Sequence, residues 1–295
     1  MSDKASVAIT IDDNYVQHAC VMLQSLMDNN IRRLDVFCVC SGLSRANLTS
    51  LRNHFKKTRL QLHFIEFPKY LLPVLPIRPG EHITAASFFR IWLPELLYGQ
   101  DGVLFLDSDI IVNGDISCLL DLNIGDRAVA AIEDPGIDER KKEDLGIPPN
   151  QKYFNAGVLI MNLNYFRKHD LTKKTAQFIR AHPDKCEFHD QDALNAVIKG
   201  AFIPLGFHYN CQSVLFEERF INQSRFTTAL TKPAVIHFTG RGDCKPWALH
   251  NSHPMKGLYY HYLKRTPFYN YSPPGAPPIT RKFGILRTLS RKAYI

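Results

Sequence analysis

Short apolar runs alternate with helix-length segments along the chain, and this alternation most constrains its fold. The runs lie at 6–11, 34–40, 60–66, 102–106, 128–132, 156–161 and 234–238, with helical patterns at about 15–28, 44–56, 84–98, 163–181 and 190–199. Strands separated by helices predict βαβ units and a mainly parallel sheet, which binds ligands at the carboxyl ends of its strands. At 295 residues and 45% apolar, the chain can form one large α/β domain with a small appendage.

Two carboxylates follow the fourth apolar run. Val103-Leu104-Phe105-Leu106 leads into Asp107-Ser108-Asp109 after an Asp-Gly turn signal. In extended chain Asp107 and Asp109 point to one side while Ser108 points away. Two carboxylates at a strand end predict a site for a hard divalent cation that binds a phosphorylated substrate. The alternative is a helix cap or Asx turn.

Further polar blocks follow other runs. They are Asp12-Asp13-Asn14-Tyr15, Asn155-Ala156-Gly157, His189-Asp190-Gln191-Asp192 and His237-Phe238-Thr239-Gly240, the last leading to Lys245-Pro246-Trp247. In this order the blocks resemble glycosyltransferase family 8, over about residues 5–250. That family comprises retaining enzymes, among them bacterial lipooligosaccharide and lipopolysaccharide galactosyl- and glucosyltransferases.

The resemblance implies a fold and an activity. Residues 1–250 would form a Rossmann-like, GT-A type nucleotide-diphospho-sugar transferase domain. It would move galactose or glucose from a UDP-hexose donor, with α linkage, to a lipid-linked saccharide. The resemblance assigns Asp107, Asp109 and His237 as metal ligands, and imidazole beside two carboxylates favours Mn²⁺ over Mg²⁺.

The nucleotide would bind near the first strand. Tyr15 could stack on the uracil ring, with Asp12 and Asn14 bonded to its edge or to the ribose; an ordinary helix N-cap is the alternative. By resemblance, the other donor-binding residues are Thr10, Arg90, Ser108, Asn155, Ala156, Gly240 and Lys245. The loop at 241–244 is longer than the family pattern, so Arg241 could share the task of Lys245 at the diphosphate.

Asp190 and Gln191 are the candidate catalytic residues. Gln191 stands where the family places a residue close to the anomeric carbon. An amide is a poor nucleophile, which favours same-face attack by the acceptor over a covalent intermediate. If a covalent route operates, Asp190 is the candidate nucleophile.

The positive charge of the chain is concentrated in its tail. Residues 244–295 hold nine Lys and Arg and no acidic residue, which leaves 27 basic and 28 acidic residues in 1–243. After a Pro-rich stretch, basic and apolar residues alternate over 279–295, which predicts a helix on an anionic membrane surface; a solubilising tail is the alternative. We therefore expect 251–295 to be a membrane-association segment, with no nucleic-acid partner.

The cysteines indicate the cellular compartment of the protein. There are seven, with no CxxC pair, which indicates reduced thiols and a cytoplasmic protein at the inner face of the membrane. The Pro-rich loop from Pro68 to about His82 could cover the ligand crevice, or be an inert surface loop.

Two other functions stay open from the sequence. Leu106-Asp107-Ser108-Asp109 also resembles the nucleophile motif of haloacid-dehalogenase-type phosphatases, although that motif usually stands on the first strand. A non-catalytic nucleotide-sugar-binding protein would retain the same ligands.

Overall fold

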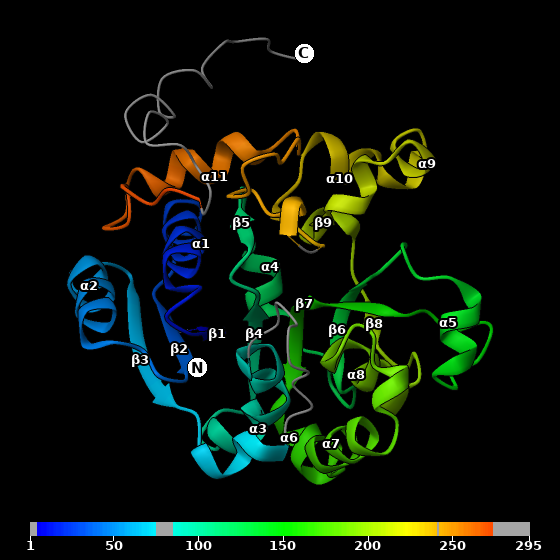
Figure 1. Cartoon of the computed structure of the whole chain (residues 1–295). Helices are drawn as coiled ribbons and strands as arrows, with labels where there is room; N and C mark the ends of the chain where they lie inside the picture. The colour runs from blue at the N-terminus through cyan, green and yellow to red at the C-terminus, as the bar shows by residue number, and fades with distance from the viewer. Residues whose placement is uncertain (1–4, 75–84, 241, 274–295) are drawn as a thin grey trace.

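The structure is built around one seven-stranded sheet (Figure 1). The computed structural model describes residues 5–74, 85–240 and 242–273. The sheet order is β3-β2-β1-β4-β7-β6-β8. The strands are β1 (Ala5–Ile11), β2 (Leu34–Cys40), β3 (Leu60–Glu66), β4 (Gly102–Leu106), β6 (Val129–Glu133), β7 (Phe154–Asn162) and β8 (Ile203–Pro204). The predicted α/β class with a mainly parallel sheet is confirmed.

Among the strands of this sheet, β7 alone runs opposite to its neighbours. It pairs antiparallel with both β4 and β6, whereas the other pairs are parallel. The sequence predicted a strand here but not its direction. Because β7 is reversed, its first residues lie at the carboxyl ends of β4 and β6. The entrance of β7 therefore contributes to the ligand edge of the sheet.

Helices cover both faces of the sheet, in three layers. On β1, Val7 and Ile9 pack into one apolar core, which includes residues of α1 (Val16–Asp28), α2 (Arg45–Phe55) and α4 (Ser117–Asp121). Ala8 enters the core on the other face, with α3 (Leu93–Leu96), α6 (Leu163–Lys168), α7 (Leu171–Ala181) and α8 (Asp190–Ile198). This alternation is the period of two expected for a strand buried on both sides.

A second, three-stranded sheet lies beside the ligand edge. It consists of β5 (Ile110–Val112), β10 (Val235–His237) and β9 (Cys211–Gln212), in the order β5-β10-β9. The run predicted at 234–238 is therefore a strand, but of this small sheet. β10 pairs antiparallel with β5, and His237 stands opposite Ile110. This register brings His237 to the turn that joins β4 to β5.

Two predicted helices differ in detail. The stretch predicted at 163–181 is split into α6 and α7, because Asp170 adopts a left-handed backbone with φ of 52°. The stretch predicted at 84–98 is mostly 3₁₀-helix, Ala85–Trp92, followed by the short α3. The remaining short helices are α5 (Glu139–Asp144), α9 (Glu218–Ile221) and α10 (Thr227–Thr231).

Residues 251–273, the part of the chain after residue 250 that the structure describes, pack on the body of the protein. Helix α11 (Lys256–Leu263) lies against α1: Asn29 donates a hydrogen bond to the Tyr262 hydroxyl at 2.8 Å, and His18 bonds the Tyr259 hydroxyl at 2.7 Å. The predicted membrane helix, 279–295, lies outside the described residues. The expected boundary at residue 250 stays a prediction.

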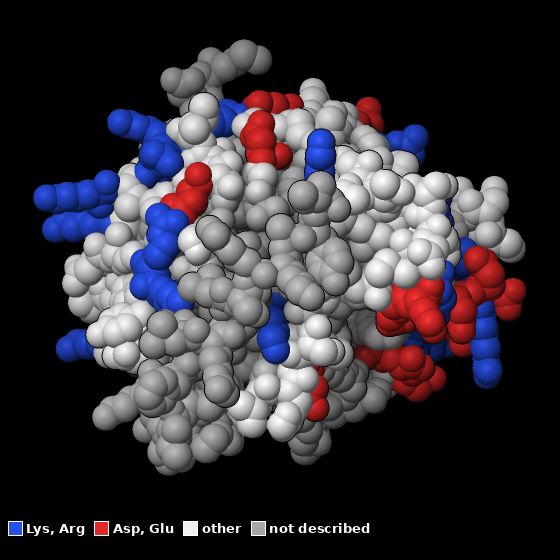
Figure 2. Space-filling view, turned by 90° about the horizontal axis from the view of Figure 1, so that it is seen from above, with Lys and Arg blue, Asp and Glu red and all other residues white. Residues whose placement is uncertain are grey.

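Charged side chains are unevenly distributed over the surface. Seen from above, Lys and Arg stand out on the left, the side of α2, while Asp and Glu gather on the right, the side of α5 (Figure 2). All seven cysteines are free, five of them buried. Within the described ranges, no helix is long and apolar enough to span a membrane.

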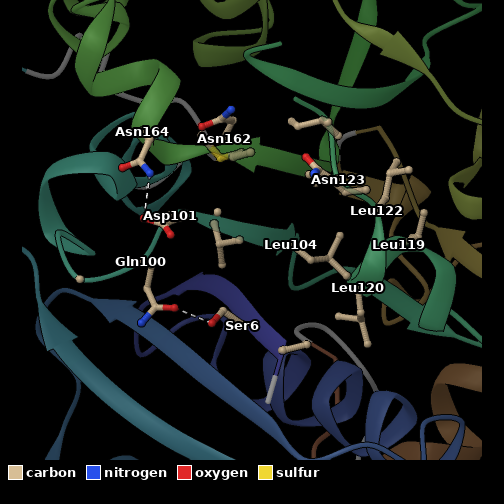
Figure 3. A pocket seen from close by; sticks show the side chains of 17 residues that line it. Ser6, Gln100, Asp101, Leu104, Leu119, Leu120, Leu122, Asn123, Asn162 and Asn164 are labelled. Carbon is tan, nitrogen blue, oxygen red and sulfur yellow. Dashed lines mark hydrogen bonds between the residues drawn. The ribbon is translucent and has the colours of Figure 1, made fainter. Parts of the chain in front are cut away.

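Among the cavities of the described residues, one lies at each end of the central strands. The cavity at the amino end of β4, about 550 Å³, has polar groups that bond to one another: Ser6 donates to Gln100, and Asn164 to Asp101 (Figure 3). The cavity at the carboxyl ends, about 380 Å³, contains Asp107, Asp109 and His237. Only the second combines carboxylates with an imidazole, so it is the candidate site.

Candidate functional site

Asp107, Asp109 and His237 converge at the turn between the two sheets. One ligand atom from each lies within 4.8 Å of the others, a spacing suited to a shared metal ion. His237 Nε2 is 3.3 Å from Asp109 Oδ1 and 3.7 Å from Asp107 Oδ2. The turn is held by backbone bonds, from Asp107 N–H to Gly157 O at 2.9 Å and from Phe238 N–H to Asp109 O at 3.1 Å. The predicted convergence of the three side chains is therefore found.

Gly157 leaves the space that this cluster needs. A Cβ built there would lie 2.7 Å from His237 Nδ1, 2.8 Å from Asp107 Oδ2 and nearer still to His237 Cε1. No real Cβ tolerates such contacts. The imidazole thus packs directly on bare backbone of β7, and two hard oxygen donors beside it fit a divalent cation such as Mn²⁺.

Lys245 is ion-paired with Asp109, and it also donates a hydrogen bond to Phe238 O at 2.8 Å. Burial alone would raise the pKa of Asp109, but the Lys245 ammonium group holds that pKa below its ordinary value. The pKa of Lys245 is in turn raised, because Asp109 outweighs the effect of burial. The lysine therefore supplies the positive charge that the carboxylate requires in this structure.

The backbone before Lys245 depends on glycine. Gly240 has φ of 97°, and a Cβ there would come within 2.8 Å of Cys244 Cβ. Glycine is required on both counts. Arg241, the expected alternative to Lys245, lies outside the described residues, so the choice between them stays a prediction.

Arg90 joins the cluster of Asp107, Asp109 and His237 to Asp190 across the cleft. Its Nη2 is 3.0 Å from Asp107 Oδ1, and its Nε is 2.7 Å from Asp190 Oδ2. The guanidinium also lies over the Phe105 ring, 4.6 Å from its centroid. Burial raises the pKa of Asp190 to about 7, against the opposing effect of Arg90. One cation thus serves two carboxylates, which leaves Asp190 incompletely neutralised.

Gln191 is fixed at both ends of its amide. Its Oε1 accepts from Ala156 N–H at 2.9 Å, and its Nε2 donates to Asp134 Oδ2 at 3.2 Å. Burial raises the pKa of Asp134. Sequence reasoning missed Asp134, although it follows a predicted strand and precedes the turn signal Pro135-Gly136. A carboxylate at a strand end could have identified it.

A second missed residue is Asn210, which is fully buried. It bonds His237 Nδ1 at 2.9 Å and donates to Asn155 Oδ1 at 2.9 Å. Asn155, which was predicted to bind the sugar-nucleotide donor, thus has its side-chain amide hydrogen-bonded to protein groups, and it is only 5% exposed. Nothing in the sequence around Asn210 signals this role.

The predicted nucleotide pocket begins at the end of β1. Asp12 Oδ1 accepts from the N–H groups of Asn14 and Tyr15 at 2.9 and 3.0 Å, so the local turn anticipated as the alternative is present. The Ser108 hydroxyl donates to Thr10 O at 3.1 Å and ties β1 to the aspartate turn. The Tyr15 ring lies edge-on to Trp247, 5.8 Å between centroids. The stacking role of Tyr15 stays a prediction.

Comparison with known proteins gives a consistent result. A sequence model described as glycosyl transferase family 8 matches residues 6–250. General stress protein A of Bacillus subtilis is 32% identical over 266 residues, 86% of this chain and 91% of that protein. Lipopolysaccharide 1,2-glucosyltransferase of Escherichia coli K12 is 27% identical, over 94% of this chain and 83% of that protein.

Solved structures agree with the sequence comparisons. The crystal structure of the galactosyltransferase LgtC in complex with donor and acceptor sugar analogs has a TM-score of 0.80 and 25% identity. It covers 94% of this chain and 99% of its own. The fold of this protein is therefore the GT-A glycosyltransferase fold.

Proposed function

Because the chain belongs to glycosyltransferase family 8, we propose that this glycosyltransferase moves galactose or glucose from a UDP-sugar to a saccharide acceptor, with retention and α linkage. The observation that carries the proposal is the cluster of Asp107, Asp109 and His237 beside Asp190 and Gln191 in one cleft. A metal-binding end and a sugar-binding end within one cavity suit a nucleotide-diphospho-sugar. The structure of LgtC with sugar analogs supports a donor and an acceptor of this kind.

A divalent cation, Mn²⁺ with Mg²⁺ as the alternative, would be held by Asp107, Asp109 and His237. Bound there, it would neutralise diphosphate oxygens and stabilise the diphosphate as it leaves. Lys245 then has a second role. Its ammonium group, held beside the cluster by Asp109, would add a second positive charge for the diphosphate.

Arg90, Asp190 and Gln191 would position the sugar. Asp190 and Arg90 present charged groups to the hydroxyls of the donor, and Gln191 is held rigidly by Ala156 N–H and Asp134. A neutral amide that is held by two hydrogen bonds can orient the sugar but is a poor nucleophile. This favours same-face attack by the acceptor. Asp190 remains the candidate for a covalent route.

For the acceptor we infer a lipid-linked saccharide of the lipooligosaccharide type, reached from the inner face of the cytoplasmic membrane. The similarity to lipopolysaccharide 1,2-glucosyltransferase supports the acceptor class, and the basic, apolar sequence at 279–295 is the basis for attachment. Deleting 279–295 should release the protein from anionic liposomes and leave transfer to a soluble sugar intact. Equal sedimentation of the truncated protein would remove the attachment proposal.

The activity is tested with UDP-galactose, UDP-glucose and UDP-N-acetylglucosamine, each with and without Mn²⁺ and with and without an added saccharide acceptor. We expect acceptor-stimulated UDP release with one hexose, and an α-linked product by ¹H NMR. Asp109→Asn should abolish transfer, while Asp115→Asn, an exposed turn carboxylate, should not. Binding without turnover would favour the nucleotide-sugar-binding alternative. Since family membership is shown, the phosphatase alternative is set aside.

A further inference from the structure

A chain of buried amides lies behind His237, on the side away from the carboxylates. Asn210 stands between the 3₁₀-helix Phe207–Tyr209 and β9 and is fully buried. Its Oδ1 is 2.9 Å from His237 Nδ1, and its Nδ2 donates to Asn155 Oδ1 at 2.9 Å. An amide group can be turned end for end without changing its shape, so the direction of these bonds needs an independent anchor.

The anchor is the backbone N–H of Gly157, which can only donate. It donates to Asn155 Oδ1 at 3.0 Å and thereby identifies that atom as the oxygen. The Nδ2 of Asn155 then donates to Asp134 Oδ2, at 3.3 Å. The other oxygen of that carboxylate, Oδ1, accepts from Gly136 N–H.

The orientation of the Asn155 amide fixes that of the Asn210 amide. Because Asn155 Oδ1 accepts, Asn210 must present its NH₂ group to it. Its carbonyl oxygen is then left facing His237 Nδ1, at 2.9 Å. A carbonyl oxygen only accepts, so Nδ1 must carry a proton.

We propose that Asn210 is a positioning residue that holds neutral His237 in the Nδ1–H tautomer. The Nε2 lone pair then points to the side of Asp107 and Asp109, 3.7 and 3.3 Å away, where a cation needs it. The proton on Nδ1 follows from the orientation of the two amides, and the purpose of an unprotonated Nε2, metal binding, rests on the proposed function. Outer partners of ligating histidines fix the ring and its tautomer in this manner.

Removing the acceptor changes which nitrogen holds the proton. With Asn210→Leu, neutral His237 can keep its proton on Nε2 and donate it to Asp109, which removes the lone pair from the metal side. Losses of about 10- to 100-fold in metal affinity are typical when such a partner is removed. Asn210→Asp keeps an acceptor for Nδ1–H, so the tautomer and most of the Mn²⁺ affinity should survive although the bond to Asn155 is lost.

The experiment reads the tautomer directly, by long-range ¹H–¹⁵N NMR of the histidine rings in metal-free protein at alkaline pH. The His237 signals are assigned by their loss in His237→Gln. We expect a protonated Nδ1 and an unprotonated Nε2 in the natural protein and in Asn210→Asp, with the pattern moving toward Nε2–H in Asn210→Leu. Titration with Mn²⁺, followed by the EPR signal of the free ion, should show the matching loss of affinity in Asn210→Leu.

Asn30→Leu is the matched control, because Asn30 is also a buried amide and its Nδ2 donates to Arg32 O far from the site. It should keep the natural tautomer and Mn²⁺ affinity. A neutral His237 protonated on Nε2 in the natural protein overturns the proposal, as does an Asn210→Leu protein with unchanged affinity. If Asn210→Leu does not fold, the natural protein and Asn210→Asp still decide. The metal-free spectrum separates the outcomes: a wrong tautomer refutes the positioning role even in an active transferase, and Nδ1–H in an inactive protein upholds it.

Discussion

Replacing Gly157 by alanine tests whether the bare backbone of β7 positions His237, the proposed metal ligand. Gly157 has no positive φ, so alanine fits the backbone conformation and the effect comes from the methyl group alone. That methyl carbon would lie 2.7 Å from His237 Nδ1, and nearer to Cε1, whereas ordinary carbon contacts are about 3.5 Å. The ring must therefore retreat by about 1 Å.

A retreat of this size has a calculable consequence. Metal ligands tolerate deviations of about 0.2 Å, and a misplacement of 1 Å can cost about 100-fold, or roughly 2.7 kcal/mol. We expect Gly157→Ala to bind Mn²⁺ about 100-fold more weakly, and excess Mn²⁺ to restore part of the transfer rate. Overpacking should also lower the free energy of unfolding by about 1–3 kcal/mol.

The assay is Mn²⁺ titration by EPR together with urea unfolding, with Gly257→Ala as control. Gly257 lies in α11, and a Cβ added there would meet open space, so alanine should leave Mn²⁺ binding unchanged and stabilise the protein by about 0.5–1 kcal/mol. An unchanged Mn²⁺ affinity in Gly157→Ala would refute the reasoning, because it would mean that His237 can move without loss.

Three further predictions concern Tyr15, Asp190 and Lys245. Tyr15→Ala should raise the KM for the UDP-sugar, since a stacked base contributes about 1–3 kcal/mol, and Tyr15→Phe should not; equal KM values would place the base elsewhere. The pKa of Asp190 is raised to about 7, so the folded state binds a proton that the unfolded chain releases above its ordinary value of 3.8. The free energy of unfolding should therefore decrease as the pH rises from about 4 to 7. Urea titrations of the metal-free protein should not show this decrease in Asp190→Asn. Lys245→Met should lower metal-free stability by about 3 kcal/mol by leaving Asp109 unpaired, and Mn²⁺ should raise the melting temperature of this variant more than that of the natural protein.

The parts that sequence could predict are those set by local pattern. The ends of β1, β2, β3 and β4 follow from apolar runs bounded by turn signals, and Asp107 and Asp109 could be placed at a strand end for the same reason. The break between α6 and α7 could not, because the helical pattern continues through it and only the left-handed backbone of Asp170 interrupts it.

The parts that sequence could not predict depend on pairing across the chain. Asn210 meets His237 across 27 residues and Asn155 across 55, and neither distance leaves a local signal. Asp134 carried a signal, a strand end followed by Pro-Gly, but no carboxylate stands two residues away from it as Asp109 does from Asp107, so it resembled an ordinary turn. The reversal of β7 was hidden for a related reason, since a buried strand reads the same in either direction.

The irregular pairing of β7 explains how one strand can serve both ends of the cleft. Against β6, Leu159 pairs with Ala131 but Asn155 pairs with Ile132, so residues 156–158 have no partner on that side. Strand irregularities of this kind free backbone groups near functional sites. Here Ala156 N–H orients Gln191 and Gly157 N–H orients Asn155, and through Asn155 and Asn210 the second bond reaches His237. A regular strand would have bonded these two N–H groups to the strands on either side of it, and the Gln191 amide and the His237 imidazole would have lost their common reference on the backbone.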